Sequence, residues 1–355
     1  MRGSLTGELM KKKRNISRLG LLLAGGGAKV RRLLAENGHQ QSRDLEQALA
    51  TNLPAALLDA ARTAEESAVP RLLERVSRAG WQWLDSSSPD YPAALNQTTD
   101  PPLGLFVKGR LDPGPAVAIV GSRRATAYGN QVSRLLAETV GRAGGTIISG
   151  MARGVDAAAH EGALSVGGKT WAVWGCGPDR VYPPEHAGLA ERIGETGALV
   201  TEYLPGSSPR RHHFPERNRI VAGLASVVVV VEAAARSGAL STARQALDEG
   251  REVMAVPGSI FSEVSVGPNG LLRAGAQPVA CAGDLLEALG LDRETEAVVG
   301  TNLEATHIEF GEAVTVDELA QRMGKTVDIV QVTLVEMEIH GLIERGTDGL
   351  IRRRK

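Results

Sequence analysis

The sequence has few aromatic and cysteine residues, and these shortages exclude several kinds of site. Aromatic side chains make up only 3% of the 355 residues, which argues against a binding face built mainly on stacked rings. The two cysteines, Cys176 and Cys281, lack CxxC spacing, and the seven histidines show no ligand spacing, so we expect no metal site. Isolated thiols are typical of a reducing compartment, and we expect a cytoplasmic protein.

Long apolar runs are also lacking. No stretch approaches the roughly 20 apolar residues that a membrane-spanning helix needs, so we expect no membrane partner. The basic run at 11–14 has no long apolar segment after it, and we expect no signal peptide. Met1 and Met10 both remain candidate start residues.

Cofactor-binding signatures are missing as well. A dinucleotide-binding turn needs GxGxxG, but the turn GSRRATAYG (121–129) carries Ser122 and Arg123 there. The next apolar run ends in Ser149-Gly150, and no acidic residue is present to hold a ribose. We therefore expect no NAD(P), FAD or other cofactor.

The charge is unevenly distributed, although the net charge is only −1. Residues 1–80 contain 14 Lys/Arg against 8 Asp/Glu, whereas residues 291–355 contain 8 against 13. A basic N-terminal part favours a polyanionic partner. The acidic C-terminal part is more typical of a protein-contact module than of a strong duplex binder.

Residues 115–290 show the repeating pattern of a parallel sheet. Apolar, β-rich runs begin near Ala116, Thr146, Thr170, Ser226 and Arg251, with a further run near 197, and helix-like segments fill the gaps. The run VVVVV (227–231) is typical of a strand buried on both faces. The fold class is therefore α/β, with an extended Rossmann-like doubly wound sheet.

Three further segments flank this core. Residues 1–85 are predicted to form a helical domain, in which the turn Gly25-Gly26-Gly27 joins two helices. That pattern fits either a phosphate-gripping helix-hairpin-helix or a small helical domain with a flexible turn; Lys29, Arg31 and Arg32 are its candidate secondary DNA contacts. Residues 86–114 are predicted as a connector, with a short strand within 103–109. Residues 291–355 are predicted to form a winged helix: a capped helix at 314–324, a second helix from 325 to Gly341, and a β-ribbon turning at Asp348-Gly349.

Glycine-, serine- and arginine-rich turns follow several of the core's apolar runs. In a parallel sheet such turns meet at one edge, where helix N-termini and cationic side chains bind anions. The candidate phosphate-binding residues are Gly121, Ser122, Arg123, Arg124, Ser149, Gly150, Arg153, Lys169, Arg217, Asn218 and Arg219.

Several of these candidates have a second interpretation. Arg217 and Arg219, in a turn predicted before a helix, fit an anion clamp or a structural salt bridge with Glu202 or Glu232. Lys169 precedes its strand, so on its own it fits an ordinary solvated residue. Trp171 and Trp174 similarly fit either the core or a base-stacking surface. No catalytic nucleophile or acid/base pair accompanies these turns, which favours a binding protein over an enzyme.

In these motifs the chain resembles the DprA/Smf family, the DNA-processing protein A of natural transformation. IVGSRRATAYG, SGMARGVDAAAHEGAL, GKTWAVWGCGPDRVYPPEH, PERNRIVAGLA and SGALSTARQALDEGREVMAVPGSI match the family core in order and spacing. The resemblance implies an N-terminal SAM-like domain and a C-terminal winged helix. It also implies sequence-independent binding of single-stranded DNA, homodimerisation through the Rossmann fold, and loading of the RecA recombinase onto incoming strands, with single-strand-binding protein as a further partner. By the same resemblance, Arg123 and Lys169 contact the DNA backbone.

The sequence departs from the family pattern at two points. Gly26 replaces an isoleucine common at the hairpin turn, and Pro268 replaces a threonine or cysteine. The alternative function is a nucleoside-monophosphate phosphoribohydrolase of the lysine-decarboxylase-like group. Its catalytic glutamate has no counterpart in ARSGALSTARQAL, where Ala243, Arg244 and Gln245 occupy the corresponding turn.

Overall fold

The computed structural model describes residues 16–36, 53–291, 315–323, 330, 334, 343–345 and 350–353. The chain divides into two compact units, residues 1–296 and 297–355. The boundary lies close to the predicted start of the C-terminal segment, and the N-terminal helices belong to the same unit as the sheet. The finer division of that unit at 85 and 114 remains a prediction.

The N-terminal helices are α2 (Arg18–Gly25), α3 (Gly27–Glu36) and α5 (Ala55–Arg78). Ser17 caps α2 by accepting a hydrogen bond from the Gly20 amide at 3.1 Å. Gly26 joins α2 to α3 with a φ of 75°, a left-handed value that glycine adopts without strain. The predicted helix, glycine turn and helix are thus present, and apolar residues of α2 and α5 pack into one buried cluster.

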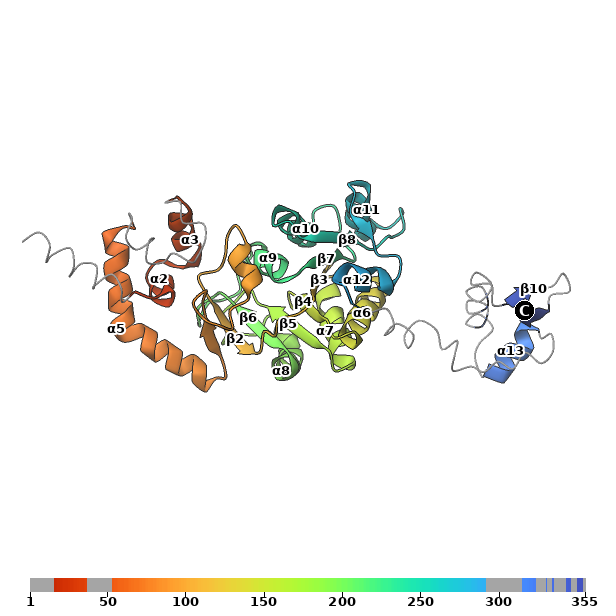
Figure 1. The fold of residues 1–355 in the computed structure, drawn as a ribbon, viewed down its shortest axis with the longest axis horizontal. Coiled ribbons are helices and arrows are strands. Elements are labelled where there is room, and N and C mark those ends of the chain that lie inside the picture. The colour runs from red at the N-terminus through yellow and green to blue at the C-terminus, as the bar shows by residue number, and fades with distance from the viewer. Residues whose placement is uncertain are drawn as a thin grey trace, which may run out of the picture. The chain divides into compact units, whose positions relative to one another are not determined.

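A nine-stranded sheet forms the centre of this unit (Figure 1). Its strands are β1 (Gln82–Leu84), β2 (Leu105–Gly109), β3 (Ala116–Val120), β4 (Thr146–Ser149), β5 (Lys169–Val173), β6 (Ala198–Thr201), β7 (Val227–Val230), β8 (Glu252–Ala255) and β9 (Gln277–Pro278). Their order is β1-β2-β6-β5-β4-β3-β7-β8-β9, and only β1 and β2 run antiparallel to their neighbours. From β3 the chain first winds outward through β4, β5 and β6, then restarts at β7 on the other side. This is the predicted doubly wound sheet, and β2 is the short strand expected in the connector.

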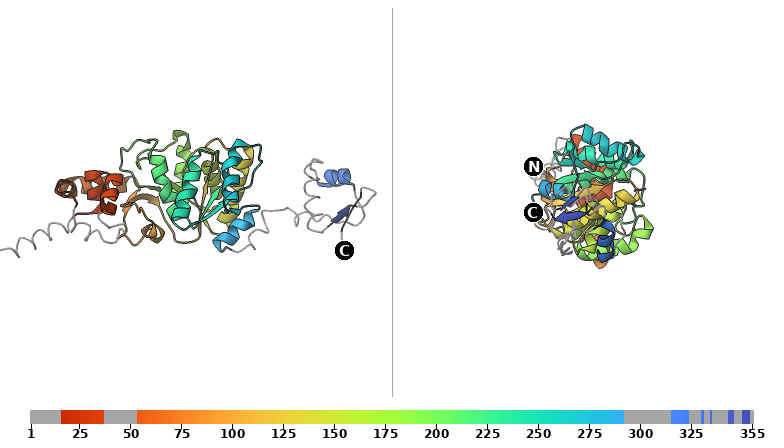
Figure 2. Two further views of the ribbon diagram at one scale, coloured as in Figure 1. Left: turned by 90° about the horizontal axis from the view of Figure 1, so that it is seen from above. Right: turned by 90° about the vertical axis from the view of Figure 1, so that its right-hand side faces the viewer.

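Helices cover both faces of the sheet (Figure 2). They are α6 (Ala127–Arg142), α7 (Val155–Ser165), α8 (Ala187–Thr196), α9 (His213–Leu224), α10 (Gly238–Asp248), α11 (Val266–Arg273) and α12 (Ala282–Leu289), with short 3-10 turns at Ala93–Gln97, Pro184–His186 and Glu263–Ser265. Alternation along β3 separates the two faces: Val117 and Ile119 pack in the cluster with α6, α7 and α12, whereas Ala118 and Val120 pack in the cluster with α9 and α10. All residues of β7 are buried, as predicted for that run.

The tryptophans at and beyond β5 belong to the core. Trp171 and Trp174 are both buried, and Trp174 makes an edge-on ring contact with Trp81 at 5.5 Å between centroids. Of their two interpretations, the structure supports packing rather than base stacking. In the described part of the chain, every helix is too short or too polar to cross a membrane.

The C-terminal unit contains α13 (Val316–Met323) and a two-stranded ribbon of β10 (Ile343–Arg345) and β11 (Ile351–Arg353). Thr315 caps α13 through a reciprocal pair of hydrogen bonds: its hydroxyl accepts from the Glu318 amide, and its own amide donates to the Glu318 carboxylate at 3.0 Å. The capped helix and the ribbon agree with the prediction. The predicted second helix and the Asp348-Gly349 turn lie largely outside the described residues.

Candidate functional site

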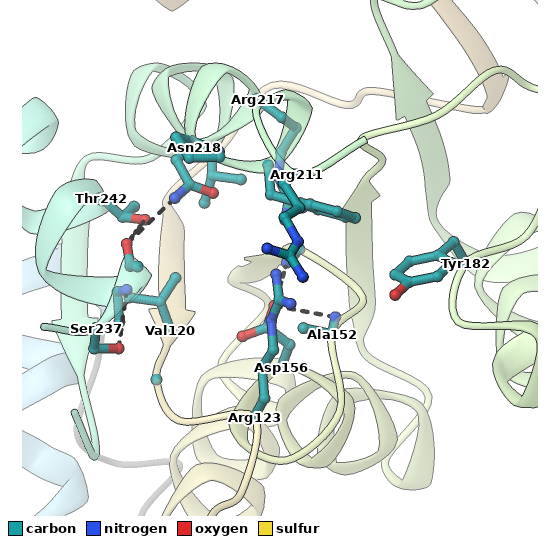
Figure 3. Close-up of a pocket in the computed structure, with 17 residues that line it drawn as sticks. Val120, Arg123, Ala152, Asp156, Tyr182, Arg211, Arg217, Asn218, Ser237 and Thr242 are labelled. Atoms are coloured by element: carbon teal, nitrogen blue, oxygen red, sulfur yellow. Dashed lines mark hydrogen bonds between the residues drawn. The ribbon is translucent and has the colours of Figure 1, made fainter. Parts of the chain in front are cut away.

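A cleft of about 500 Å³ lies beyond the carboxyl ends of the parallel strands, beside the point where the strand order reverses (Figure 3). Open α/β sheets bind ligands at this position because the loops on either side diverge there. One wall comes from the turns after β3 and β4, and the other from α9 and the start of α10. Its lining residues are Val120, Gly121, Arg123, Gly150, Ala152, Asp156, Tyr182, Arg211, Phe214, Pro215, Arg217, Asn218, Val221, Ser237, Gly238, Ala239 and Thr242.

The turn after β3 presents Arg123 to this cleft. Gly121 is packed so closely that an added Cβ would lie 2.6 Å from Val155 Cγ2, so only glycine fits at this position of the turn. The Arg124 amide donates to Ser122 Oγ at 3.1 Å, which shapes the turn. The Arg123 guanidinium carbon lies 4.9 Å from the centroid of the Phe214 ring, a cation–π contact that holds the side chain at the cleft.

The turn after β4 is held by a buried carboxylate. Asp156 Oδ2 accepts hydrogen bonds from the Gly150 amide at 3.1 Å and the Ala152 amide at 3.2 Å. Between these two, Met151 has a φ of 64°, unusual for a residue with a side chain. Ser149 lies below the turn, where its hydroxyl donates to the Ile119 carbonyl at 2.7 Å. Asp156 therefore shapes the loop, and the Ser149 hydroxyl serves the sheet instead of the cleft.

Arg217 is buried beneath this loop, opposite Asp156. Its guanidinium donates to the Val173 carbonyl, and a Cβ at Gly150 would fall 2.3 Å from its Nη1 atom. Burial lowers the pKa of Arg217 and raises the pKa of Asp156, because each charge loses its water shell; their mutual attraction opposes both shifts. Arg217 thus forms the floor of the cleft.

The PERNRI segment is not the turn that the sequence suggested. It lies inside α9, where successive residues are rotated by about 100° and point in different directions. Asn218 reaches the start of α10, donating to the Gly238 carbonyl at 3.3 Å, while Arg219 points away to Glu202 and Asp100. For Arg219 the salt-bridge interpretation is therefore correct, and Glu202 is the acid.

Lys169 is not brought to the cleft either. It is the first residue of β5, at the opposite end of the parallel strands, and its ammonium lies 2.7 Å from an Asp112 carboxylate oxygen. Arg153 is paired with Glu185 on the surface. Of the eleven candidates, Gly121, Arg123, Gly150, Arg217 and Asn218 line the cleft, whereas Ser122, Arg124, Ser149, Arg153, Lys169 and Arg219 do not.

Twelve of the seventeen lining residues were not predicted as site residues, and three of these have cationic or aromatic side chains suited to a nucleic acid. Arg211 and Phe214 come from the entrance of α9, and Tyr182 comes from the loop after β5. The Tyr182 and Phe214 rings lie 5.5 Å apart at 40°, and Figure 3 shows Arg211 and Arg123 approaching from opposite sides with their guanidinium groups pointing toward one another. The sequence RRHHFPERNRI could have indicated Arg211 and Phe214, because basic and aromatic residues gather there before a helix.

Comparison with known proteins identifies the family of the chain and supports its fold. The family model described as DNA recombination-mediator protein A matches residues 82–290, and that described as DprA winged helix domain matches residues 306–349. The chain belongs to the DprA/Smf family. This is a family of DNA-binding recombination mediators, and the cleft lies within its defining domain.

Individual relatives agree with this assignment. Protein Smf of Escherichia coli is 41% identical over 289 residues, covering 77% of both chains, and DNA processing protein DprA of Bacillus subtilis is 40% identical over 224 residues, covering 62% of this chain and 75% of that protein. The crystal structure of DprA from Streptococcus pneumoniae superposes with a TM-score of 0.63 at 34% identity, covering 78% of this chain and 95% of that one. A structure from Helicobacter pylori, described as showing the single-stranded DNA binding mode of its DprA, gives 0.54 at 31% identity, covering 59% and 95%.

Proposed function

We propose that this chain binds single-stranded DNA, without sequence preference, in the cleft at the carboxyl edge of the sheet. The observation that carries the proposal is the convergence of three guanidinium groups, Arg123, Arg211 and Arg217, from two separate segments, the turn after β3 and the beginning of α9. Asp156 is the only acidic residue among the described lining residues, and backbone amides occupy one of its oxygens. The cleft is therefore locally cationic in a chain whose net charge is −1.

The two outer arginines are suited to a phosphodiester. Arg123 and Arg211 point toward one another, and like charges held face to face are relieved when an anion lies between them (Figure 3). Guanidinium groups bind phosphate oxygens in pairs of parallel hydrogen bonds. The start of α10, capped by Ser237, adds the positive end of a helix to the same wall.

The same cleft offers a surface for unpaired bases. Tyr182 and Phe214 are the aromatic residues of its described lining, and stacking on such rings contributes about 1–3 kcal/mol per base. Every base has a stacking face, so this contact does not discriminate between sequences. Bases inside a duplex are already stacked on their neighbours, which favours single strands over duplex DNA.

Fluorescence anisotropy of labelled single-stranded and duplex oligonucleotides across a salt series tests this proposal. We expect a preference for single strands and a log–log salt slope of roughly −0.7 per neutralised phosphate. Arg123→Ala and Arg211→Ala should each weaken binding to every sequence alike, whereas Lys169→Ala, which removes the same charge at the other strand end, should not. Equal losses for all three variants, or none, would contradict the assignment of the cleft.

We further propose that the protein acts as a homodimer that loads RecA onto incoming single strands during natural transformation, in the cytoplasm. Family membership supports this role, and two clefts on one strand would raise avidity. The test is RecA ATPase activity on single strands coated with single-strand-binding protein, with and without this protein, together with its mass in solution by ultracentrifugation. If the protein binds single-stranded DNA but does not stimulate the RecA ATPase, the proposal of RecA loading is refuted and the proposal of DNA binding stands.

A further inference from the structure

A second cleft, of about 670 Å³, lies between the N-terminal helical hairpin and the segment that enters α9. One wall is the α2–α3 turn with Lys29 and Arg31, and the other is residues 202–208 together with Arg210, His212, His213 and Glu216. Its described lining shares no residue with that of the first cleft, although the two linings interleave along residues 210–217.

The hairpin is fixed against the core by a network of ion pairs. Arg31 lies 2.7 Å from a Glu202 oxygen and 2.9 Å from an Asp100 oxygen, and Arg219 of α9 contacts the same two carboxylates. The side chains of Arg31, Arg219 and Glu202 are each at most one-tenth exposed. Arg31, which the sequence predicted as a DNA contact, is therefore engaged in holding the helical hairpin against the core. The same ion pairs place Lys29 and the start of α3 over the second cleft.

Cationic residues outnumber acidic ones in the described lining of the second cleft: Lys29, Arg31 and Arg210 face Glu202 and Glu216. The Tyr203 hydroxyl donates to Glu216 at 3.2 Å, and Glu202 Oε2 is shared by the two arginines. Among the described residues, neither Lys29 nor Arg210 has an ion-pair partner. Two cations therefore remain for an anion, beside the amides at the start of a ten-residue helix.

Two further features favour a nucleotide over a simple anion. Tyr203 and His213 stack at 4.1 Å between ring centroids, and His212 meets His213 edge-on, so one wall is aromatic. Glu202, which lines the cleft, has an oxygen, Oε1, that is buried without a hydrogen-bond partner. A buried acceptor of this kind calls for an N–H donor, and the amino or imino group of a base supplies one.

The segment between the clefts links them. Arg211, Phe214 and Pro215 line the first cleft, and Arg210, His212 and His213 line the second, so one short stretch contributes side chains to both clefts. A strand leaving the first cleft over the entrance of α9 reaches the second directly.

We propose that the second cleft binds the continuation of the same single DNA strand, with Lys29 and Arg210 on its phosphates. This inference rests on the proposed function of the first cleft. It predicts that Lys29 and Arg210 matter only for oligonucleotides long enough to reach both clefts.

The test compares oligonucleotides from about 4 to about 30 nucleotides, the range that brackets single-strand binding modules. The double variant Lys29→Ala/Arg210→Ala should match wild type on the shortest oligonucleotide that binds. On the longest it should bind about tenfold more weakly, with a salt slope smaller by roughly 1.4 for two lost phosphate contacts. Arg134→Ala/Lys169→Ala is the control, because it removes two exposed cations that line neither cleft.

The outcomes separate the two proposals. Unchanged affinity and slope on long DNA would overturn the second cleft and leave the first intact. An equal loss on short and long DNA, with an unchanged melting temperature, would also overturn it, because the residues would then act on the first cleft. Failure of the wild-type protein to bind any oligonucleotide would overturn both.

Discussion

The buried pair beneath the cleft gives a sharp prediction about stability. Asp156 accepts two backbone hydrogen bonds, and among the described residues it is the carboxylate whose charge acts on the buried Arg217. Asp156→Asn keeps the shape and an acceptor oxygen, yet it leaves the Arg217 charge without compensation. The two charges attract one another through the protein interior without a direct ion pair, so we expect the cost of leaving a buried charged group poorly satisfied, about 1–3 kcal/mol.

For a domain of this size that cost corresponds to a melting temperature lower by about 2–12 °C, at roughly 2–4 °C per kcal/mol. The measurement is thermal unfolding of wild type, Asp156→Asn and the control Asp248→Asn, which makes the same change at an exposed carboxylate of α10. The control should melt within about 2 °C of wild type, since such surface changes alter stability by about 0.5 kcal/mol at most.

A double variant tests the reasoning behind this prediction. Burial raises the pKa of Asp156 and lowers the pKa of Arg217, because both charges have lost contact with water, and their mutual attraction offsets only part of that loss. Asp156→Asn combined with Arg217→Met removes both charges and should be less destabilised than the sum of the single variants by about 2 kcal/mol. Strictly additive losses would refute the pairing and would mean that each residue acts through packing alone.

Three other predictions follow from local geometry. His160 is fully buried, with Nδ1 2.6 Å from Thr170 Oγ1, and burial lowers its pKa from 6.5 to about 3. Between these two pKa values the unfolded chain binds one more proton than the folded chain. The free energy of unfolding should therefore fall by about 1.4 kcal/mol for each pH unit below pH 6.5. His160→Asn should remove this pH dependence, as urea unfolding at pH 7 and pH 5 would show. Gly197→Ala places a Cβ 1.9 Å from the Thr170 carbonyl oxygen and should destabilise the protein by about 1–3 kcal/mol. The control Gly188→Ala lies in open space on α8 and should stabilise the protein slightly. Differential scanning calorimetry of both variants measures the difference. Ser237→Ala removes the cap of α10 and should cost about 1 kcal/mol by the same measurement; no loss would contradict the capping geometry.

The fold was largely predictable because β-branched runs and glycine turns alternate with a clear period. All six predicted core strands begin within one residue of the expected position, and β7 is buried as the run of valines suggests. The sheet order is harder to predict, because it depends on which strands pair across long separations. The antiparallel addition of β2 to β6 has no local signal in the sequence.

The site was predicted only in part, and the errors have one physical cause. A residue's position along a strand decides which edge of the sheet it reaches, and Lys169 stands at the start of β5 whereas Gly150 stands just past the end of β4. In a helix the direction changes with each residue, so Arg217 and Arg219, read as one clamp, serve different contacts. Arg211 was overlooked because the start of α9 was placed too late in the chain.

Net charge was a poor guide to the binding surface, and the structure shows why. The basic excess of residues 1–80 includes Arg31, which is consumed by Glu202 and Asp100. The core has nearly balanced charge, yet its cleft gathers three arginines around a single carboxylate that backbone amides engage. Affinity for a phosphate backbone depends on this local field, which falls off within roughly 8–10 Å at physiological salt, and not on the net charge of the chain. Deleting residues 297–355, which form a separate compact unit, should therefore leave single-strand affinity and its salt slope unchanged within about twofold. A large change in the anisotropy titration would show that the acidic unit itself contacts DNA or screens the cleft.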